Sequence, residues 1–465
     1  MARWYLSRIV SGLGRDGGWD ETPRRGRKTG NQVLVPSSLL SLSLVNSDLR
    51  GTTMTIDVLR TCGPSVFEAE LPTIAYQHAQ SAGEAHELIR QARRHGPIAM
   101  GPFGPEVLAY DLVRTVLRDD RFATPKGGTL AAQGVTSGEL WDIVVKGPLS
   151  LDGAAHHRQR RLVSKAFTPK AAGRLRTTCA DVIAELVYQH VGAGRCDVVA
   201  DIARQYPIPI ICALLGTPRE DWHLFSTWAD DFFKVFDWNV VNDAPDIVGA
   251  WKELEAYLDE MVTGRRDALT DDLLSDMMRA EVDGDRLGHD ELLTLAGTLL
   301  MAGTDTTRNQ LAAAVQVFCD HPDQWRLLAE YPELAPQAVE ETMRFSPIVF
   351  MTVRIAVEDV ELGGVTIPAG TLVIVNTAAA NHDPAVYDKP ERFDITREGP
   401  SAMLTFGGGI HYCLGAHLAR IELAEALTTM ARRMPNIRCT GAAPWKPFIG
   451  ITGPISLPVE FDCGY

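Results

Sequence analysis

The feature that most limits how this chain can fold is a long, largely apolar segment from about Asp290 to Asp320. The pattern predicts one helix over the whole segment. The helix is expected to stop at His321-Pro322, because the residue before a proline is disfavoured in helical conformation. At 1.5 Å per residue such a helix is roughly 45 Å long. It is therefore long enough to cross the centre of a large domain.

The rest of the chain is predicted to be mostly helical, with a minor β region toward the C-terminal third. Helices are expected over 82–95, most of 154–281, 335–344 and 414–433, and strands over 353–357, 360–362, 372–376 and 455–461. No Ser/Gly-rich or charge-rich linker interrupts the chain after about residue 54. Residues 54–465 are therefore expected to form one large domain.

Residues 1–53 differ in composition from the remainder. They contain the basic run 24–28 and many glycines and serines, which is typical of a disordered basic tail. We therefore predict that this N-terminal extension is disordered, and that it is either dispensable or the result of a misassigned start site.

Composition excludes several classes of protein. The chain of 465 residues is 45% hydrophobic and 22% charged, as in an ordinary soluble globular protein. Its net charge of −14 argues against nucleic-acid binding, which needs a basic surface. The eight cysteines are scattered and never form C-x-x-C, which indicates reduced thiols in a cytosol. The apolar run 33–45 is too short to span a bilayer, so we expect a cytoplasmic protein without a membrane span.

Cys413 lies in a glycine-rich loop, Phe406-Gly-Gly-Gly409-Ile-His-Tyr-Cys413-Leu-Gly415, just before a predicted helix. Glycines allow the backbone to approach another group closely. The positive end of the helix dipole favours a thiolate, the form of cysteine that binds metals. A lone cysteine is more often a small buried hydrophobic residue, and only its neighbours favour the metal ligand here.

Two further clusters carry chemistry. Glu341 and Arg344 are three residues apart on one predicted helix, so their side chains can form a charge-assisted pair. The segment 302–307 places Gly303, Asp305 and Thr306 in the middle of the long apolar helix. A local kink with a partly exposed aspartate is one interpretation. The other is an opening of the helix that presents an acid and hydroxyls to a buried reaction centre.

Together these residues resemble the cytochrome P450 family of haem-thiolate monooxygenases, from about residue 84 to the C-terminus. Residues 390–393 resemble the segment whose arginine, here Arg392, joins the Glu341–Arg344 pair in that family. Residues 155–160 resemble its haem-contacting His-x-x-x-Arg helix, and 415–422 resemble its soluble bacterial branch. The resemblance implies the cytochrome P450 fold, a single large helical domain around a buried haem.

The resemblance also implies a role for each matched residue. Cys413 would be the axial thiolate of haem b. Asp305 and Thr306 match the pair that delivers protons during catalysis. Glu341, Arg344 and Arg392 would form a structural charge cluster under the cysteine loop. The residues expected to contact the haem or its propionates are His156, Arg160, Arg354, Phe406, Gly409, His411 and Gly415.

The implied reaction inserts one oxygen atom from O2 into a hydrophobic small molecule, by hydroxylation or epoxidation. Apolar residues should line the substrate pocket, with Leu299, Leu300, 348–353 and 448–451 as its wall and Trp141 and 232–238 as lids. Electrons would come from a ferredoxin or flavodoxin with its NAD(P)H reductase. Such an acidic partner could dock on the basic run 158–176, although such a run is as often only a solvated helix face.

Three alternatives remain open from the sequence. A haem peroxygenase or isomerase of the same fold would share the motifs. A haem sensor without turnover would have no need of Asp305 and Thr306. A structural zinc site formed by His411, Cys413 and His417 lacks the second cysteine pair of the usual zinc patterns.

Overall fold

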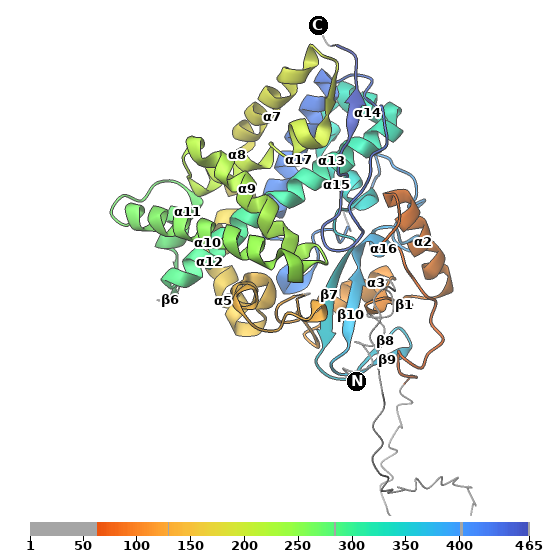
Figure 1. The fold of residues 1–465 in the computed structure, drawn as a ribbon. Helices are drawn as coiled ribbons and strands as arrows, with labels where there is room; N and C mark the ends of the chain where they lie inside the picture. The colour runs from red at the N-terminus through yellow and green to blue at the C-terminus, as the bar shows by residue number, and fades with distance from the viewer. Residues whose placement is uncertain (1–62, 129, 283–284, 400–402, 464–465) are drawn as a thin grey trace, which may run out of the picture. The chain divides into compact units, whose positions relative to one another are not determined.

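The computed structural model describes residues 63–128, 130–282, 285–399 and 403–463, so the predicted extension 1–53 lies outside the described residues. The described part is mainly helical, as predicted (Figure 1). Its α-helices are α2 (Ala82–His95), α3 (Tyr110–Val116), α4 (Glu139–Lys146), α5 (Gly153–Val163), α6 (Pro169–Gly173), α7 (Arg176–Val191), α8 (Pro207–Leu215), α9 (Trp222–Phe232), α10 (Val240–Arg265), α11 (Leu273–Arg279), α12 (His289–Ala302), α13 (Asp305–Asp320), α14 (Pro322–Glu330), α15 (Ala335–Phe345), α16 (Thr377–Asn381) and α17 (Ala416–Arg433).

The minor β region is also present. Its strands are β1 (Ile98–Gly101), β2 (Gly104–Val107), β3 (Phe122–Ala123), β4 (Arg195–Asp197), β5 (Glu281–Val282), β6 (Asp285–Arg286), β7 (Met351–Ala356), β8 (Val360–Leu362), β9 (Val365–Ile367), β10 (Leu372–Asn376), β11 (Arg438–Cys439) and β12 (Pro458–Glu460). The largest sheet has the order β1-β2-β10-β7-β3. In it β10 is parallel to β2 and antiparallel to β7, with Val373 opposite Arg354. This register places Arg354 within a central strand.

The long predicted helix is broken into α12 and α13. Thr304 donates from Oγ1 to the Met301 carbonyl at 2.7 Å, and Thr306 donates to the Ala302 carbonyl at 2.8 Å. Threonines that bond back to the preceding turn bend helices. At Gly303 a Cβ would lie 2.7 Å from Ile211 Cδ1, so only glycine lets α8 pack this closely. The prediction of one continuous helix is therefore wrong in detail, and the predicted interruption at 302–307 is confirmed.

The largest part of the core lies where α13 packs against α17, α15 and α14 (Figure 1). Phe318 and Trp325 are buried there with ring centroids 5.0 Å apart. Trp325 also donates from Nε1 to the Met434 carbonyl at 3.0 Å, so its polar atom is satisfied. Burial of a large apolar side chain stabilises the fold by about 2–3 kcal/mol. This packing fixes α13 relative to α17, the helix that follows the cysteine loop.

One helical stretch among the described residues, Val198–Leu215, is long and apolar enough to cross a membrane by length and composition. The protein interior buries 56% of it. Ile202, Tyr206 and Ile210 of this stretch belong to the core around α13. Its apolar character is therefore that of a core helix.

Two histidine rings lie close together, tilted by 42° to one another, near Phe345 of α15. The rings of His86 and His382 are 4.2 Å apart, and neither nitrogen of His86 has a hydrogen-bond partner. Burial, and then the nearby Arg344, lower the pKa of His86 to about 3. Burial, His86 and Arg344 also hold the pKa of His382 well below its usual range. Both rings are therefore neutral in the native state at neutral pH.

We predict that His86 makes the fold sensitive to acid. An unfolded histidine takes up a proton near pH 6.5, whereas the native ring does so only near pH 3. The stabilising effect of keeping His86 neutral is thus complete above pH 6.5 and is lost as pH falls toward 3. Relative to wild type, His86→Phe should gain about 2 kcal/mol in free energy of unfolding between pH 7 and pH 5, measured by urea denaturation.

The comparison with the variant is needed because Glu106 and Glu422 act in the opposite direction. Burial raises the pKa of Glu106 to about 7 and that of Glu422 to about 8, so both stabilise the fold more as pH falls toward 4.5. An equal pH dependence in wild type and His86→Phe would contradict the assignment.

Candidate functional site

The cysteine loop is closed by its own backbone and held against the end of α3. Cys413 donates its N–H to the Phe406 carbonyl at 2.9 Å. Gly409 has φ +66°, and a Cβ there would lie 2.2 Å from the Leu117 carbonyl oxygen, so no other residue fits without movement. Leu117 directly follows α3. The loop therefore has one backbone path, which positions the Cys413 sulfur.

Two opposing effects act on the Cys413 thiol. Burial raises its pKa, whereas the Gly415 N–H, Arg160 and Arg420 lower it, and the effect of burial is the larger one. The helix end and the arginines therefore do not make a thiolate by themselves. A sulfur in this position becomes anionic when a cation binds to it, because a coordinating thiol is deprotonated outright.

Open space adjoins Gly415. Its φ of −80° is ordinary, and apart from its neighbours in the chain no atom lies within 4 Å of where its Cβ would be. Phe406 lines the main cavity, and the guanidinium of Arg420 lies 4.5 Å from the centre of its ring. The cation over its face fixes the orientation of the Phe406 ring. A flat group in the main cavity thus finds an apolar ring at Phe406.

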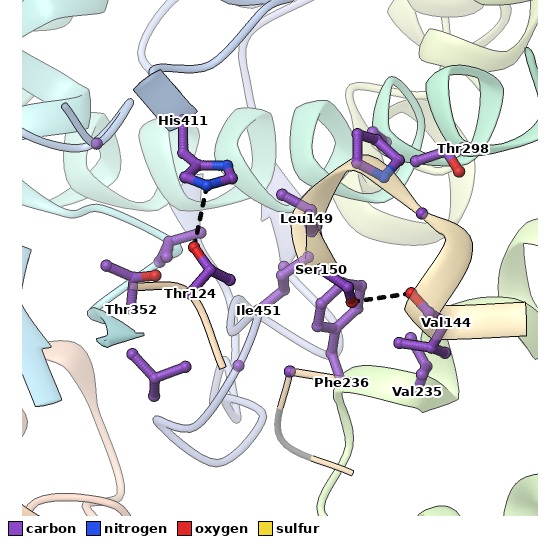
Figure 2. A pocket seen from close by; sticks show the side chains of 18 of the residues that line it. Thr124, Val144, Leu149, Ser150, Val235, Phe236, Thr298, Thr352, His411 and Ile451 are labelled. Carbon is purple, nitrogen blue, oxygen red and sulfur yellow. Dashed lines mark hydrogen bonds between the residues drawn. The ribbon is translucent and has the colours of Figure 1, made fainter. Parts of the chain in front are cut away.

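Four basic side chains gather beside this loop. His411 contacts Asp152 at 2.8 Å and Thr124 at 3.0 Å through Nε2, and Figure 2 draws the contact with Thr124. The His156 ring lies 4.3 Å from that of His411, and its buried Nδ1 has no hydrogen-bond partner. Burial, followed by His411 and Arg160, lowers the pKa of His156 to about 4.

The two arginines of the group are also poorly compensated. Arg160 donates to the Tyr412 carbonyl, and Arg354 donates to the Val353 carbonyl at 2.8 Å. Burial lowers the pKa of both guanidinium groups. Arg354 is buried and Arg160 is half-buried, and a cation removed from water without a close carboxylate is unfavourable by itself. The cluster is therefore suited to an anionic group that enters from the cavity.

The main cavity has a volume of about 410 Å³. His411, Thr124 and Thr352 lie on one side of it, and Val144, Ser150, Val235 and Phe236 lie on the other (Figure 2). The predictions for Met351–Val353, Ile451 and most of 232–238 are confirmed, since these residues line it. From α12 the lining residues are Thr298, Met301 and Ala302, so the prediction of Leu299 and Leu300 is wrong. Leu300 faces the core instead.

Asp305 and Thr306 are neighbours in sequence but face different spaces. Thr306 lines the main cavity. Asp305 is buried and pairs with Arg308 Nε at 3.2 Å and Lys446 Nζ at 3.8 Å. It lines a second, polar cavity of about 90 Å³ that also contains Asp237. The break between α12 and α13 lets consecutive side chains reach both cavities.

The predicted charge cluster is present with one correction. Arg344 donates from Nε to Glu341 Oε2 at 2.7 Å, and both side chains are almost fully buried. The second arginine on Glu341 is Arg397, whose Nε lies 3.1 Å from Oε2. The prediction of Arg392 is wrong: its side chain is 63% exposed and pairs with Asp394, and only its carbonyl accepts from Arg344. The chain turns after Arg392, and this turn brings Arg397 to the Glu341–Arg344 pair.

The buried pair is linked to the cysteine loop by hydrogen bonds. Arg344 donates to the Asn381 carbonyl at 3.1 Å. The Asn381 amide oxygen accepts from the Leu404 N–H at 2.7 Å, and its nitrogen donates to Thr405 Oγ1 at 2.8 Å. Thr405 in turn donates to the Met343 carbonyl at 2.8 Å. Position and burial of Glu341 and Arg344 therefore set where the loop begins.

Sequence reasoning missed three residues of the site. Arg397 lies four residues beyond the matched segment 390–393. This closeness to the matched segment could have indicated its role. Asp152 and Arg420 gave no such indication, because their roles depend on contacts with His411 and Phe406 from other elements. The basic run 158–176 also differs from expectation: Arg158, Arg174 and Arg176 each pair with a carboxylate. The run carries less uncompensated charge than the sequence predicts.

Comparison with known proteins agrees with this geometry. The family model for cytochrome P450 matches residues 74–450. The chain is 37% identical over 399 residues to luteothin monooxygenase of Streptomyces thioluteus, covering 84% of this chain and 97% of that one. It is 39% identical over 367 residues to mycinamicin IV hydroxylase/epoxidase of Micromonospora griseorubida, covering 77% and 90%.

Solved structures give the same result. The cytochrome P450 hydroxylase LnmA of the leinamycin biosynthetic pathway of Streptomyces atroolivaceus superimposes with a TM-score of 0.71 at 38% identity, covering 80% of this chain and 95% of that one. The chain therefore belongs to the cytochrome P450 family. It is a haem-thiolate monooxygenase with haem b as cofactor, and it requires a substrate, O2 and a redox partner.

The residues present fit such a group. Nothing opposes a Cβ at Gly415, and the unpartnered Nδ1 of His156 is a buried polar atom that needs a partner. The guanidinium groups of Arg160 and Arg354 supply positive charge for two carboxylates, whereas burial lowers the pKa of His411, whose ring is suited to hydrogen bonding.

Substitutions should distinguish the buried Arg344 from the exposed Arg392. Arg344→Ala leaves Glu341 buried with one partner fewer, which costs about 3–5 kcal/mol and should yield protein with little haem. Arg392→Ala, the matched control on an exposed arginine, should cost about 1 kcal/mol or less and retain haem. Haem content per polypeptide and thermal unfolding measure both. Normal haem content in Arg344→Ala, or its loss in Arg392→Ala, would contradict the cluster as described.

Proposed function

We propose that Cys413 ligates the iron of haem b and that the chain hydroxylates or epoxidises a hydrophobic small molecule held in the main cavity. The observation that carries the proposal is the arrangement of that cavity. Phe406, Arg354 and His411 form one side of it, and Thr306 with an apolar wall forms the rest. A cofactor on the first side faces a substrate on the second.

We assign the binding residues by their contacts. Gly409 gives the loop its path, Gly415 leaves space beside it, and Phe406, whose carbonyl accepts from the Cys413 N–H, presents its ring to the cofactor from the cavity wall. His156, Arg160, Arg354 and His411 bind the propionates, which removes the cost of leaving buried cations unpaired. When bound, the haem supplies the activation of O2.

Thr306 and Asp305 are proposed to deliver protons. Thr306 Oγ1 donates to the Ala302 carbonyl and keeps its lone pairs toward the main cavity, so it can hold a water there. Asp305 is reached from the second cavity, where Asp237 and Lys446 provide further exchangeable protons. In this proposal the Asp305 carboxyl takes up a proton from the second cavity, turns away from Arg308 and gives the proton to the water that Thr306 holds at Oγ1.

We further propose a ferredoxin or flavodoxin, with its NAD(P)H reductase, as the redox partner, and a cytoplasmic location. Seven described cysteines are free thiols, as in a reducing compartment. The proposed partner approaches the face where Tyr412 is exposed beside Cys413.

The thiolate ligand can be tested by spectroscopy. Reduced protein under carbon monoxide should show a strongly red-shifted Soret band, because a thiolate donates electron density to the iron. Cys413→His should bind haem with an ordinary band position, while Cys439→Ser, a control on another thiol, should keep the shift. An ordinary band in the wild-type protein would refute ligation by Cys413.

Proton delivery can be tested by coupling. Thr306→Ala should divert most reducing equivalents to hydrogen peroxide, lowering product per NAD(P)H by about tenfold or more, within the range for loss of a proton-transfer group. Thr306→Ser keeps the hydroxyl and should retain coupling near that of wild type. Unchanged coupling in Thr306→Ala would argue against the assignment.

A further inference from the structure

The main cavity contains few charges. Among the described residues that line it, no Asp, Glu or Lys occurs, and the charged or titratable side chains are Arg354 and His411. Both lie on the cofactor side. A substrate ion would therefore be buried without a partner of opposite charge, which is strongly unfavourable.

The charges of the second cavity do not change this. Phe233, Phe236 and Ile451 line both cavities and form the wall between them. Behind that wall Lys446 pairs with Asp305, and Arg308 pairs with Asp305 and Asp230. These cations are already compensated.

The hydroxyl groups of the substrate side already donate their hydrogen bonds within the protein. Four hydroxyl groups donate to backbone carbonyls at 2.7–3.0 Å: Ser150 to Val144, Thr298 to Thr294, Thr306 to Ala302 and Thr377 to Val349 (the Ser150 bond is drawn in Figure 2). A carboxylate needs donors, and these groups offer lone pairs. Both charge and hydrogen bonding therefore disfavour an acid in the cavity.

Aromatic rings dominate the wall that faces the cofactor side. α9, the 3-10 helix η7 (Phe233–Phe236) and α10 contribute Phe232, Phe233, Phe236 and Trp251, and Trp238 follows η7. The rings of Phe232 and Trp251 lie 5.1 Å apart, and those of Phe233 and Phe236 lie 5.7 Å apart and stacked. Such a wall binds flat, conjugated groups more strongly than saturated ones.

We propose that the substrate is an uncharged molecule with an aromatic or conjugated flat part, and that the cavity rejects fatty acids and quaternary amines of the same size. The proposal rests on the proposed function, because Arg354 and His411 are unavailable to a substrate only when the propionates occupy them.

The test measures binding to the haem-loaded protein. The probes share one skeleton: naphthylpropanamide is neutral, naphthylpropanoate is an anion, and naphthylethyl-trimethylammonium is a cation that cannot ligate iron through a lone pair. Quenching of naphthyl fluorescence by the haem gives the dissociation constant of each naphthyl probe, and displacement of the naphthyl amide gives that of the saturated analogue. The amide should bind about tenfold or more tighter than either ion, and about threefold or more tighter than its saturated decalinyl analogue.

A gain of function sharpens the test. Ser150→Arg places a cation at a half-buried position of the wall and should bring the anion within about threefold of the amide. Ser150→Gln is the matched control without charge and should leave the wild-type gap. Equal or tighter binding of an ion by the wild-type protein, failure of the amide to bind, or an unchanged gap in Ser150→Arg would overturn the inference. A normal carbon monoxide band in the same sample shows that such a failure concerns the substrate and leaves Cys413 ligation intact.

Discussion

The buried ion pair between Glu341 and Arg344 is the interaction on which the rest of the site depends. Two charges in an apolar interior are tolerated only when every oxygen and nitrogen has a partner. Here the partners are Arg397 and a set of backbone carbonyls, including that of Asn381. Asn381 then holds the start of the cysteine loop. The hydrogen bonds that this one ion pair requires thus hold together segments that are far apart in the chain.

A second constraint acts on the central helix. A continuous apolar helix of this length would have no irregularity in its backbone on the cofactor side. Gly303 and the back-bonded Thr304 and Thr306 interrupt it where α8 packs against it. The break costs regular helical geometry at one point. Because of the break, the side chains of Asp305 and Thr306 point into different cavities.

The fold class, most helix positions and the residues of the cysteine loop could be predicted from sequence, because periodicity and a dense motif report on local structure. Arg392 shows the limit. A short motif identifies an arginine by its neighbours, but the turn that follows decides which guanidinium reaches Glu341, and here Arg397 does. Leu300 shows another limit, since apolar character does not tell which face of a buried helix meets a cavity. The opposing effects on the Cys413 thiol also depend on burial, which sequence does not reveal.

The separation of Asp305 from the main cavity has a consequence for how this enzyme can change. Asp305 and its charged neighbours lie behind Phe233, Phe236 and Ile451, and the remaining residues of the substrate side do not line the second cavity. Substitutions that reshape the substrate side therefore need not disturb the ionic environment of the acid. A wall of this kind allows selection to alter substrate range in small steps while the supply of water and protons to Asp305 stays constant.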